Sequence, residues 1–142
     1  MTRTLRRLAR IQRLQQDEAR NAYLEAERVR WAHTRELDDC ERQLASALAD
    51  PAGSADERMR RHTFSLRQEM QRRQLQARAD KLDADVEVHR GQLLVAATRV
   101  KTTETITDRL EARALEEADR RTQRELDEAG ILSWSRGRGG AL

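Results

Sequence analysis

Hydrophobic residues recur at helical spacing along residues 2–49, with charged and polar residues between them. Steps of three and four place one residue from each turn on the same face of a helix. The average step of roughly 3.6 is closer to a straight helix than to the heptad repeat of a supercoil. The expected apolar face comprises Leu8, Ile11, Gln15, Ala19, Ala22, Ala26, Val29, His33, Leu37, Cys40, Leu44 and Leu48. The pattern therefore predicts one long helix over residues 2–49.

A break follows this helix. Pro51 disfavours helical geometry in Asp50, and Gly53 permits a reversal of the chain. Ser54 and Glu57 then have the spacing of a capping box, in which the hydroxyl accepts from the third amide and the carboxylate reaches back. The rival start is Asp50 as the cap with Pro51 in the first turn. We favour Ser54, because glycine would weaken a first turn.

A second helix is expected over residues 55–129. Its expected apolar face comprises Met59, Thr63, Leu66, Met70, Ala77, Ala84, Val88, Gly91, Val95, Thr98, Thr102 and Thr105. Residues 98–107 are rich in β-branched side chains, which indicates either a locally weak helix or a bend. Residues 131–142 contain a glycine-rich run, and we expect them to form a disordered tail.

The predicted fold is all-α: a long antiparallel two-helix coiled-coil hairpin over residues 1–130, with a turn at 50–54. A short turn between two helices makes the antiparallel arrangement the default. Folding at about Gly53 pairs residues whose numbers sum to about 106. The first helix would then end opposite Thr103. The segment Ile106 to Glu128 is therefore expected to overhang as a helix without a partner.

The composition suits a rod better than a compact core, because 37% of the residues are charged and only 3% are aromatic. The formal net charge is +3, with both signs interspersed as on a solvated helix surface. We find no glycine-rich phosphate loop and no metal-ligand spacing. His33, His62, His89 and the single Cys40 are expected at the seam or on the surface. The sequence thus predicts no catalytic, metal or cofactor site.

No apolar run approaches the length of a membrane span, and no signal-peptide core follows the first residue. We therefore expect a cytoplasmic protein. Because the sequence predicts no catalytic site, we also expect that it is not an enzyme.

The beginning of the chain carries an arginine cluster with no acidic residue before Asp17. Its members are Arg3, Arg6, Arg7, Arg10 and Arg13. One short cluster without interleaved aromatic residues is a weak indication of membrane or nucleic-acid binding. We favour a contact with another protein through this basic end, and a merely solvated face is the alternative.

A lateral apolar stripe is the second candidate surface. In the expected register it joins Leu24, Trp31, Leu75 and Leu82, to which Tyr23 and Phe64 add aromatic side chains. The simpler interpretation is a broadened seam, with these residues in flanking positions. The functional interpretation is an exposed docking surface.

The run EADRRTQRELDE at residues 117–128 resembles the end of the FliJ/YscO family, central-stalk proteins of flagellar and injectisome type III export. The basic start around Leu5, Leu8 and Ile11 is similar to the start of family members, as are the chain length and the mid-chain break. Between the two branches, we favour the flagellar FliJ proteins.

The resemblance implies a stalk whose paired termini enter a hexameric export ATPase ring. It also implies contacts with the cytoplasmic domain of the export gate and with export chaperones, and a place at the cytoplasmic face of the inner membrane through these partners. Carried over, the ring-facing residues would be Arg6, Arg7, Arg10, Arg13, Arg120, Arg121 and Arg124. The candidates for gate or chaperone binding would be Trp31, Phe64 and Leu75.

Two other functions remain open from the sequence. The first is a general coiled-coil adaptor that dimerises through its seam. The second is a nucleic-acid binder that uses the arginine-rich start and the RGRGG motif at residues 136–140. The mixed charge along both helices argues against a nucleic-acid partner.

Overall fold

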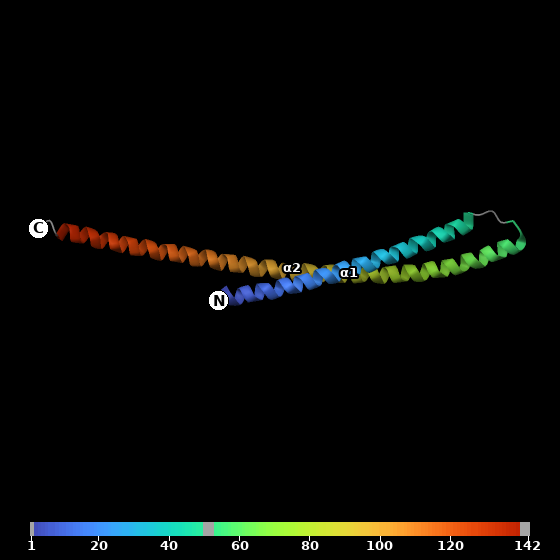
Figure 1. Ribbon diagram of the computed structural model, residues 1–142, viewed down its shortest axis with the longest axis horizontal. Helices are drawn as coiled ribbons and strands as arrows, with labels where there is room; N and C mark the ends of the chain where they lie inside the picture. Colours follow the sequence, from blue (N-terminus) through green and yellow to red (C-terminus); the bar gives the residue numbers. More distant parts are fainter. Residues whose placement is uncertain (1, 50–52, 140–142) are drawn as a thin grey trace. The chain divides into compact units, whose positions relative to one another are not determined.

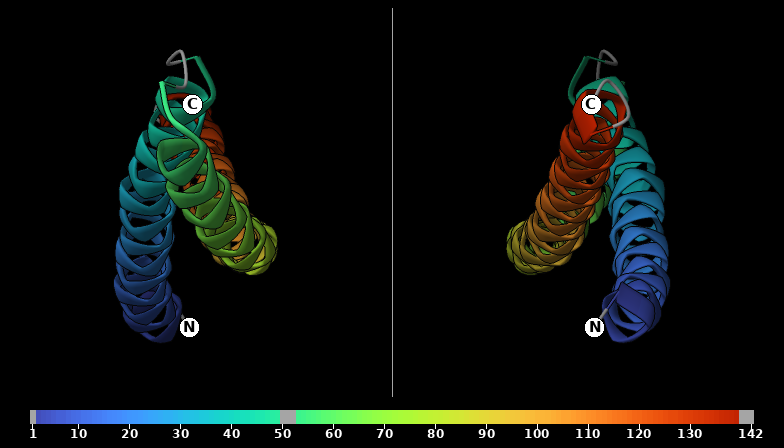
Figure 2. Two further views of the ribbon diagram at one scale, coloured as in Figure 1. Left: turned by 90° about the vertical axis from the view of Figure 1, so that its right-hand side faces the viewer. Right: turned by 90° about the vertical axis from the view of Figure 1, so that its left-hand side faces the viewer.

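The computed structural model describes residues 2–49 and 53–139, and within these ranges the chain is helical apart from Gly53 and Ser54. Helix α1 spans Thr2–Ala49 and helix α2 spans Ala55–Gly139 (Figure 1). The part of the chain that is described contains no strand (Figure 2). The predicted all-α class is confirmed. Helix α1 begins and ends at Thr2 and Ala49, and α2 begins at Ala55.

The start of α2 is held by the predicted capping box. The backbone amide of Glu57 donates to the Ser54 hydroxyl at 3.2 Å, and the Glu57 carboxylate accepts from the amides of Gly53 and Ser54 at 3.2 and 3.4 Å. Three amides near the first turn of the helix thereby find acceptors. The rival cap at Asp50 and Pro51 lies outside the described residues.

The chain divides into two compact units. Unit 1 comprises Met1–Arg13 and Thr98–Leu142, and unit 2 comprises Leu14–Ala97. In unit 2, α1 and α2 run antiparallel: His33 contacts Leu75, and Cys40 contacts Gln68.

In unit 1 the two helices are again antiparallel, because Arg6 contacts Glu111 and Arg13 contacts Glu104. The predicted hairpin pairing of two helices is therefore present.

Most buried and half-buried positions in the paired part of α2 follow a strict heptad repeat. The repeat comprises Arg61, Ser65, Gln68, Arg72, Leu75, Ala79, Leu82, Val86, His89, Leu93, Ala96, Val100, Thr103, Thr107 and Leu110. Four more residues, each directly after a repeat position, are also half-buried: Glu69, Asp83, Ala97 and Glu104. Every step of the repeat alternates between four and three, which is a period of 3.5 rather than the expected 3.6. We call the residues of the repeat the α2 seam. Such a repeat keeps one narrow face turned toward a partner helix.

The predicted apolar face of α2 is wrong along its whole length. Met59, Met70, Val88 and Val95 all lie on the exposed side, and the other members of that face are exposed as well. The helix carries two stripes at heptad spacing, and the true seam was obscured because it includes polar residues such as Arg72. From Leu75 onward the true seam carries large aliphatic side chains such as Leu82 and Val86, and covering them removes apolar surface from water.

The α1 seam is only partly as predicted. Ala19, Ala22, Ala26, Val29, His33, Leu37, Cys40 and Leu44 are buried or half-buried as expected. Leu8, Ile11, Gln15 and Leu48 are exposed, and Leu5, Ala9 and Ala47 take inner positions instead. Near its start, α1 is therefore rotated relative to the prediction.

The register also differs from the prediction. Residue numbers of contacting pairs sum to 108 for Cys40 with Gln68 (40 + 68) and to 117 for Arg6 with Glu111 (6 + 111), not to about 106. The start of α1 therefore lies beside Glu111 rather than opposite Thr103. Thr103 is itself buried, so the unpaired part of α2 begins after Glu111 instead of at Ile106.

Helix α2 continues beyond the expected end at Ala129 to Gly139. Residues 131–139 are helical, so the expected tail without structure is wrong there, and residues 140–142 lie outside the described part. Within residues 98–107 the helix is also continuous. The hydroxyls of Thr102, Thr105 and Thr107 each donate to the carbonyl four residues earlier at 2.8 Å, which satisfies these side chains inside a helix.

Candidate functional site

Unit 1 brings the arginine-rich start of α1 beside an acidic side of α2. Arg6 Nη2 lies 3.1 Å from Glu111 Oε1, and Arg13 Nε lies 3.0 Å from Glu104 Oε1. Both ion pairs are largely exposed, so each contributes little to stability. Their main consequence is that the charges of Arg6 and Arg13, two of the predicted partner-binding arginines, are neutralised by carboxylates of the same chain.

The remaining arginines of the cluster point elsewhere. Arg3, Arg7 and Arg10 are separated by four and three residues, which places them on one exposed face of α1. Among the described side chains, no ion pair or hydrogen bond involves these three. The predicted arginine cluster therefore divides into two parts. Arg6 and Arg13 form ion pairs within the chain, and the other three arginines form a free basic face.

After Glu111, helix α2 is exposed at every described position up to Gly139. Arg120 Nη2 lies 3.3 Å from Glu116 Oε1 one turn earlier, a local pair on the helix surface. Arg121 and Arg124 are exposed, and no ion pair involving them occurs in the described part of the chain. These three predicted ring-facing residues lie on the unpartnered segment.

The end of α2 carries large apolar side chains, and all of them except Leu126 fall in the predicted tail at residues 131–142. Leu126, Ile131, Leu132 and Trp134 are all exposed. The Arg138 guanidinium lies 4.6 Å from the centre of the Trp134 ring, a cation–π contact within the helix. The sequence signal for them is an apolar group shortly after the acidic run, but the glycines that follow favour a tail without structure.

Trp31 lies on the surface of unit 2 beside a groove between the helices. It is 59% exposed, and the Arg35 guanidinium stacks 4.1 Å from the centre of its ring. Leu24 and the buried Val86 line the same groove. Of the predicted lateral stripe, Leu24 and Trp31 are therefore on one accessible side of the unit.

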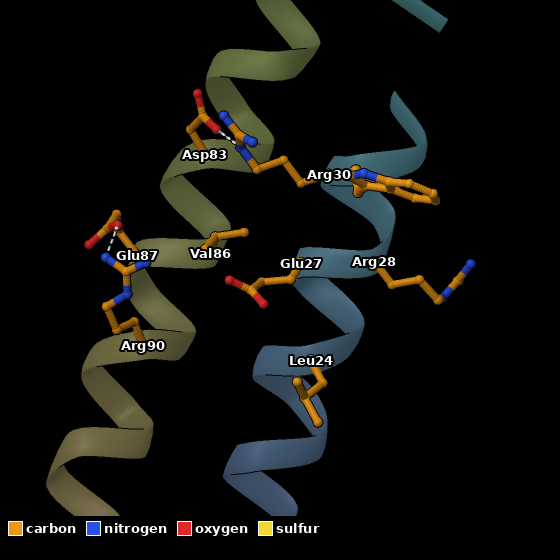
Figure 3. A pocket seen from close by; sticks show the side chains of 9 residues that line it. Leu24, Glu27, Arg28, Arg30, Asp83, Val86, Glu87 and Arg90 are labelled. Carbon is orange, nitrogen blue, oxygen red and sulfur yellow. Dashed lines mark hydrogen bonds and ion pairs between the residues drawn. The ribbon is translucent and has the colours of Figure 1, made fainter. Parts of the chain in front are cut away.

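The groove is bounded by charged side chains from both helices. Figure 3 shows Arg30 reaching from α1 to bond with Asp83 on α2. Arg90 bonds with Glu87 at 2.9 Å on the α2 side, and Val86 points toward α1. Acidic and basic groups balance one another around this opening, so its charge alone selects no sign of partner.

Leu75 and Phe64, the other predicted gate or chaperone contacts, are not gathered around Trp31. Leu75 is a half-buried member of the α2 seam, as is Leu82. This agrees with the simpler interpretation of a seam for these two residues. Phe64 is exposed and lines a separate hollow with Met59 near the start of α2.

Polar side chains occupy part of the seam in unit 2. His33 is 4% exposed, and its Nε2–H donates to the backbone carbonyl of Leu75 at 2.6 Å. Cys40 is buried, and its thiol lies 3.4 Å from Gln68 Oε1. Both are seam residues, as predicted. The ring of His89 is half-buried at the seam, and His62 is exposed.

Two carboxylates of unit 2 have perturbed titration. The side-chain hydrogen bond from Arg72 is the main cause that lowers the pKa of Glu69, and Arg73 adds to the effect. The hydrogen bond from Arg28 likewise lowers the pKa of Glu25. Because the Arg72 stem lies at the seam, its bond to Glu69 holds a charged group at the edge of the helix interface.

Two other kinds of site are absent from the described residues. No group of three or more histidine, cysteine or acidic residues is placed to hold a metal ion. Within the same residues, neither helix is apolar enough over a sufficient length to cross a membrane.

Comparison with known proteins identifies one family. The family described as Flagellar FliJ protein matches residues 1–139. No curated protein and no solved structure matches the chain.

Proposed function

Since the chain belongs to the FliJ family and therefore to the flagellar and type III protein export machinery, we propose that it is the stalk that contacts the hexameric export ATPase. In this role it couples the ring to the export gate and to cargo chaperones. It performs no catalysis itself, because hydrolysis belongs to the ring. It works in the cytoplasm, at the face of the inner membrane where its partners hold it.

One observation carries this proposal: the long stretch of α2 after Glu111 is exposed on all sides. An isolated helix in water has few sources of stability beyond its own propensity. Leu115, Leu126 and Trp134 expose large apolar surfaces there. A ring that encloses this segment would cover those surfaces and stabilise the helix.

The arginines divide their roles accordingly. Arg120, Arg121 and Arg124 lie on the unpartnered helix and would meet acidic groups of the ring. Arg7 and Arg10 are free to do the same from α1. Arg6 and Arg13 would bind only by exchanging their own glutamates for a partner's.

Unit 2 would serve the gate and the chaperones. Trp31 is the strongest candidate, because a large aromatic side chain at the rim of a groove is a common anchor in interfaces. Phe64 offers a second, separate contact. Leu75 would act only by supporting the seam from which these contacts project. An adaptor that dimerises through its seam is disfavoured, because within each unit the chain's own two helices already occupy it.

A truncation after Arg113 tests the stalk proposal. This cut removes most of the unpartnered helix and retains every α2 residue that contacts α1. We expect the helices to stay paired while binding and stimulation of a cognate export ATPase are lost. Gate or chaperone binding through unit 2 should survive, which is measured in the same preparation.

A full-length variant with Arg60, Arg67 and Arg78 changed to glutamine controls for the loss of arginine side chains that accompanies the truncation. These arginines lie in unit 2, so ATPase binding should be retained. Full stimulation by the truncated chain would overturn the proposal. A circular dichroism melt separates loss of binding from loss of folding.

A further inference from the structure

The two helices of unit 1 meet along a seam with two different edges. Arg6 and Glu111 each directly follow a seam residue, and their ion pair joins the helices on one side. Residues that directly precede a seam residue must lie on the other side of an antiparallel pair. Leu8 precedes Ala9 in this way, and Ile106 precedes Thr107. We call this second side the open edge.

Helical spacing assigns the remaining members of the open edge. It comprises Thr4, Leu8 and Ile11 of α1 and Arg99, Thr102, Ile106, Arg109 and Arg113 of α2. Leu8, Ile11 and Ile106 are 43%, 53% and 45% exposed. Half-exposed aliphatic residues from two neighbouring helices form a shallow apolar strip that no described part of the chain covers.

The charge of the open edge has one sign. Arg99, Arg109 and Arg113 are exposed, and the described residues offer them no ion pair or hydrogen bond. No acidic residue occupies an open-edge position. On the opposite side of α2, Glu104 and Glu111 supply the carboxylates that neutralise α1. The asymmetry leaves three positive charges beside an apolar strip.

We propose that the open edge binds an amphipathic helix of a partner protein whose polar face is acidic. The partner's apolar residues pack on Leu8, Ile11 and Ile106 as the third helix of a local bundle. Its carboxylates pair with Arg99, Arg109 and Arg113. Helices that pack side by side bury flanking residues of this kind, and complementary charge sets the choice of partner.

Other occupants fit these features less well. A helix that lies on a membrane presents a broad apolar face along its own length, whereas each helix here supplies only one or two aliphatic residues to the strip. Binding to single-stranded nucleic acid typically uses aromatic side chains as stacking platforms, and the open edge has none. A phosphate backbone also presents no apolar group that could cover the strip.

The test uses the full chain and two synthetic helical peptides followed by fluorescence anisotropy. Both peptides carry leucine at heptad positions, and one has glutamate and the other lysine at the flanking positions. We expect the glutamate peptide to bind and the lysine peptide not to bind. Changing Arg99, Arg109 and Arg113 to glutamate should weaken the glutamate peptide by about tenfold or more and allow the lysine peptide to bind.

The control variant reverses the same number of charges at Arg60, Arg67 and Arg78 of unit 2, and it should bind the glutamate peptide normally. An Ile106→Ser variant should weaken binding without changing the preference for glutamate. Equal binding of both peptides, or no effect of the open-edge reversal, would overturn the proposal. So would binding to phosphatidylglycerol vesicles in place of the peptide. The truncation after Arg113 retains the open edge, so peptide binding there and ATPase binding can fail independently.

Discussion

Residues 61–110 and residues 112–139 of α2 belong to one uninterrupted helix, yet only the first stretch is covered by a partner. Both are rich in charged side chains and contain no proline. The difference lies in what occupies the heptad positions. Up to Leu110 those positions include leucine, valine and alanine, which a second helix can cover.

Past Ala114 the same repeat falls on charged residues. The heptad positions after Leu110 are Ala114, Glu117, Arg121, Arg124 and Glu128. A helix laid against them would bury charges without partners, which costs far more than it returns. Within the described residues α1 also supplies no partner there, because Arg6 near its start already lies beside Glu111. The free helix carries local pairs such as Arg120 with Glu116.

The largest effect on stability is expected from a charge placed in the seam. Val100 is 7% exposed, and Val100→Asp should destabilise the fold by about 3 kcal/mol because the carboxylate would be buried without a partner. Val95→Asp makes the same change on the exposed side of α2 and should alter stability by only about 0.5 kcal/mol. Urea unfolding followed by circular dichroism measures both. Equal effects would mean that the assigned seam is wrong.

A smaller effect locates the end of the paired region. Leu110 is half-buried at the last seam position, so Leu110→Ala should cost about 1 to 2 kcal/mol. Leu115 is exposed five residues later, and Leu115→Ala should leave unfolding almost unchanged. Both substitutions replace leucine with alanine, so they raise the intrinsic helix propensity by the same small amount. If the Leu115 variant loses as much stability as the Leu110 variant, the pairing extends further along α2.

The smallest expected effect concerns pH. The folded pKa of Glu69 is lowered by its bond to Arg72, so the ionised carboxylate stabilises the folded chain above the ordinary pKa of 4.5. That contribution is lost as the pH falls through the lower folded pKa. Glu69→Gln should therefore flatten part of the acid dependence of the melting temperature. An unchanged acid dependence in the Glu69→Gln variant would contradict the assignment.

Local interactions explain why parts of the fold could be predicted. The capping box of Ser54 and Glu57 involves neighbours within one turn, so its residues are visible in the sequence. The positions of His33 and Cys40 in the seam followed from the spacing of α1. The presence of an unpartnered basic and acidic helix at the end also followed, because its pattern lacks a broad apolar face.

The candidate site was predicted less well because it depends on which faces meet. The sequence placed Arg6 and Arg13 together with Arg7 and Arg10, whereas the structure matches the first two with Glu111 and Glu104. A helix with two heptad stripes does not reveal which one is covered. Which stripe is covered depends on how α2 packs against α1, whose residues are remote along the chain.

Two long helices and the cap at the start of the second follow from local sequence, because hydrogen bonds in a helix join residues four apart. Membership of the FliJ family is likewise visible in the residues of the chain. The seam of α2, the register, and the point after Glu111 where pairing stops emerge only when the two helices pack together. These depend on the surface that two helices bury together, which neither helix specifies alone.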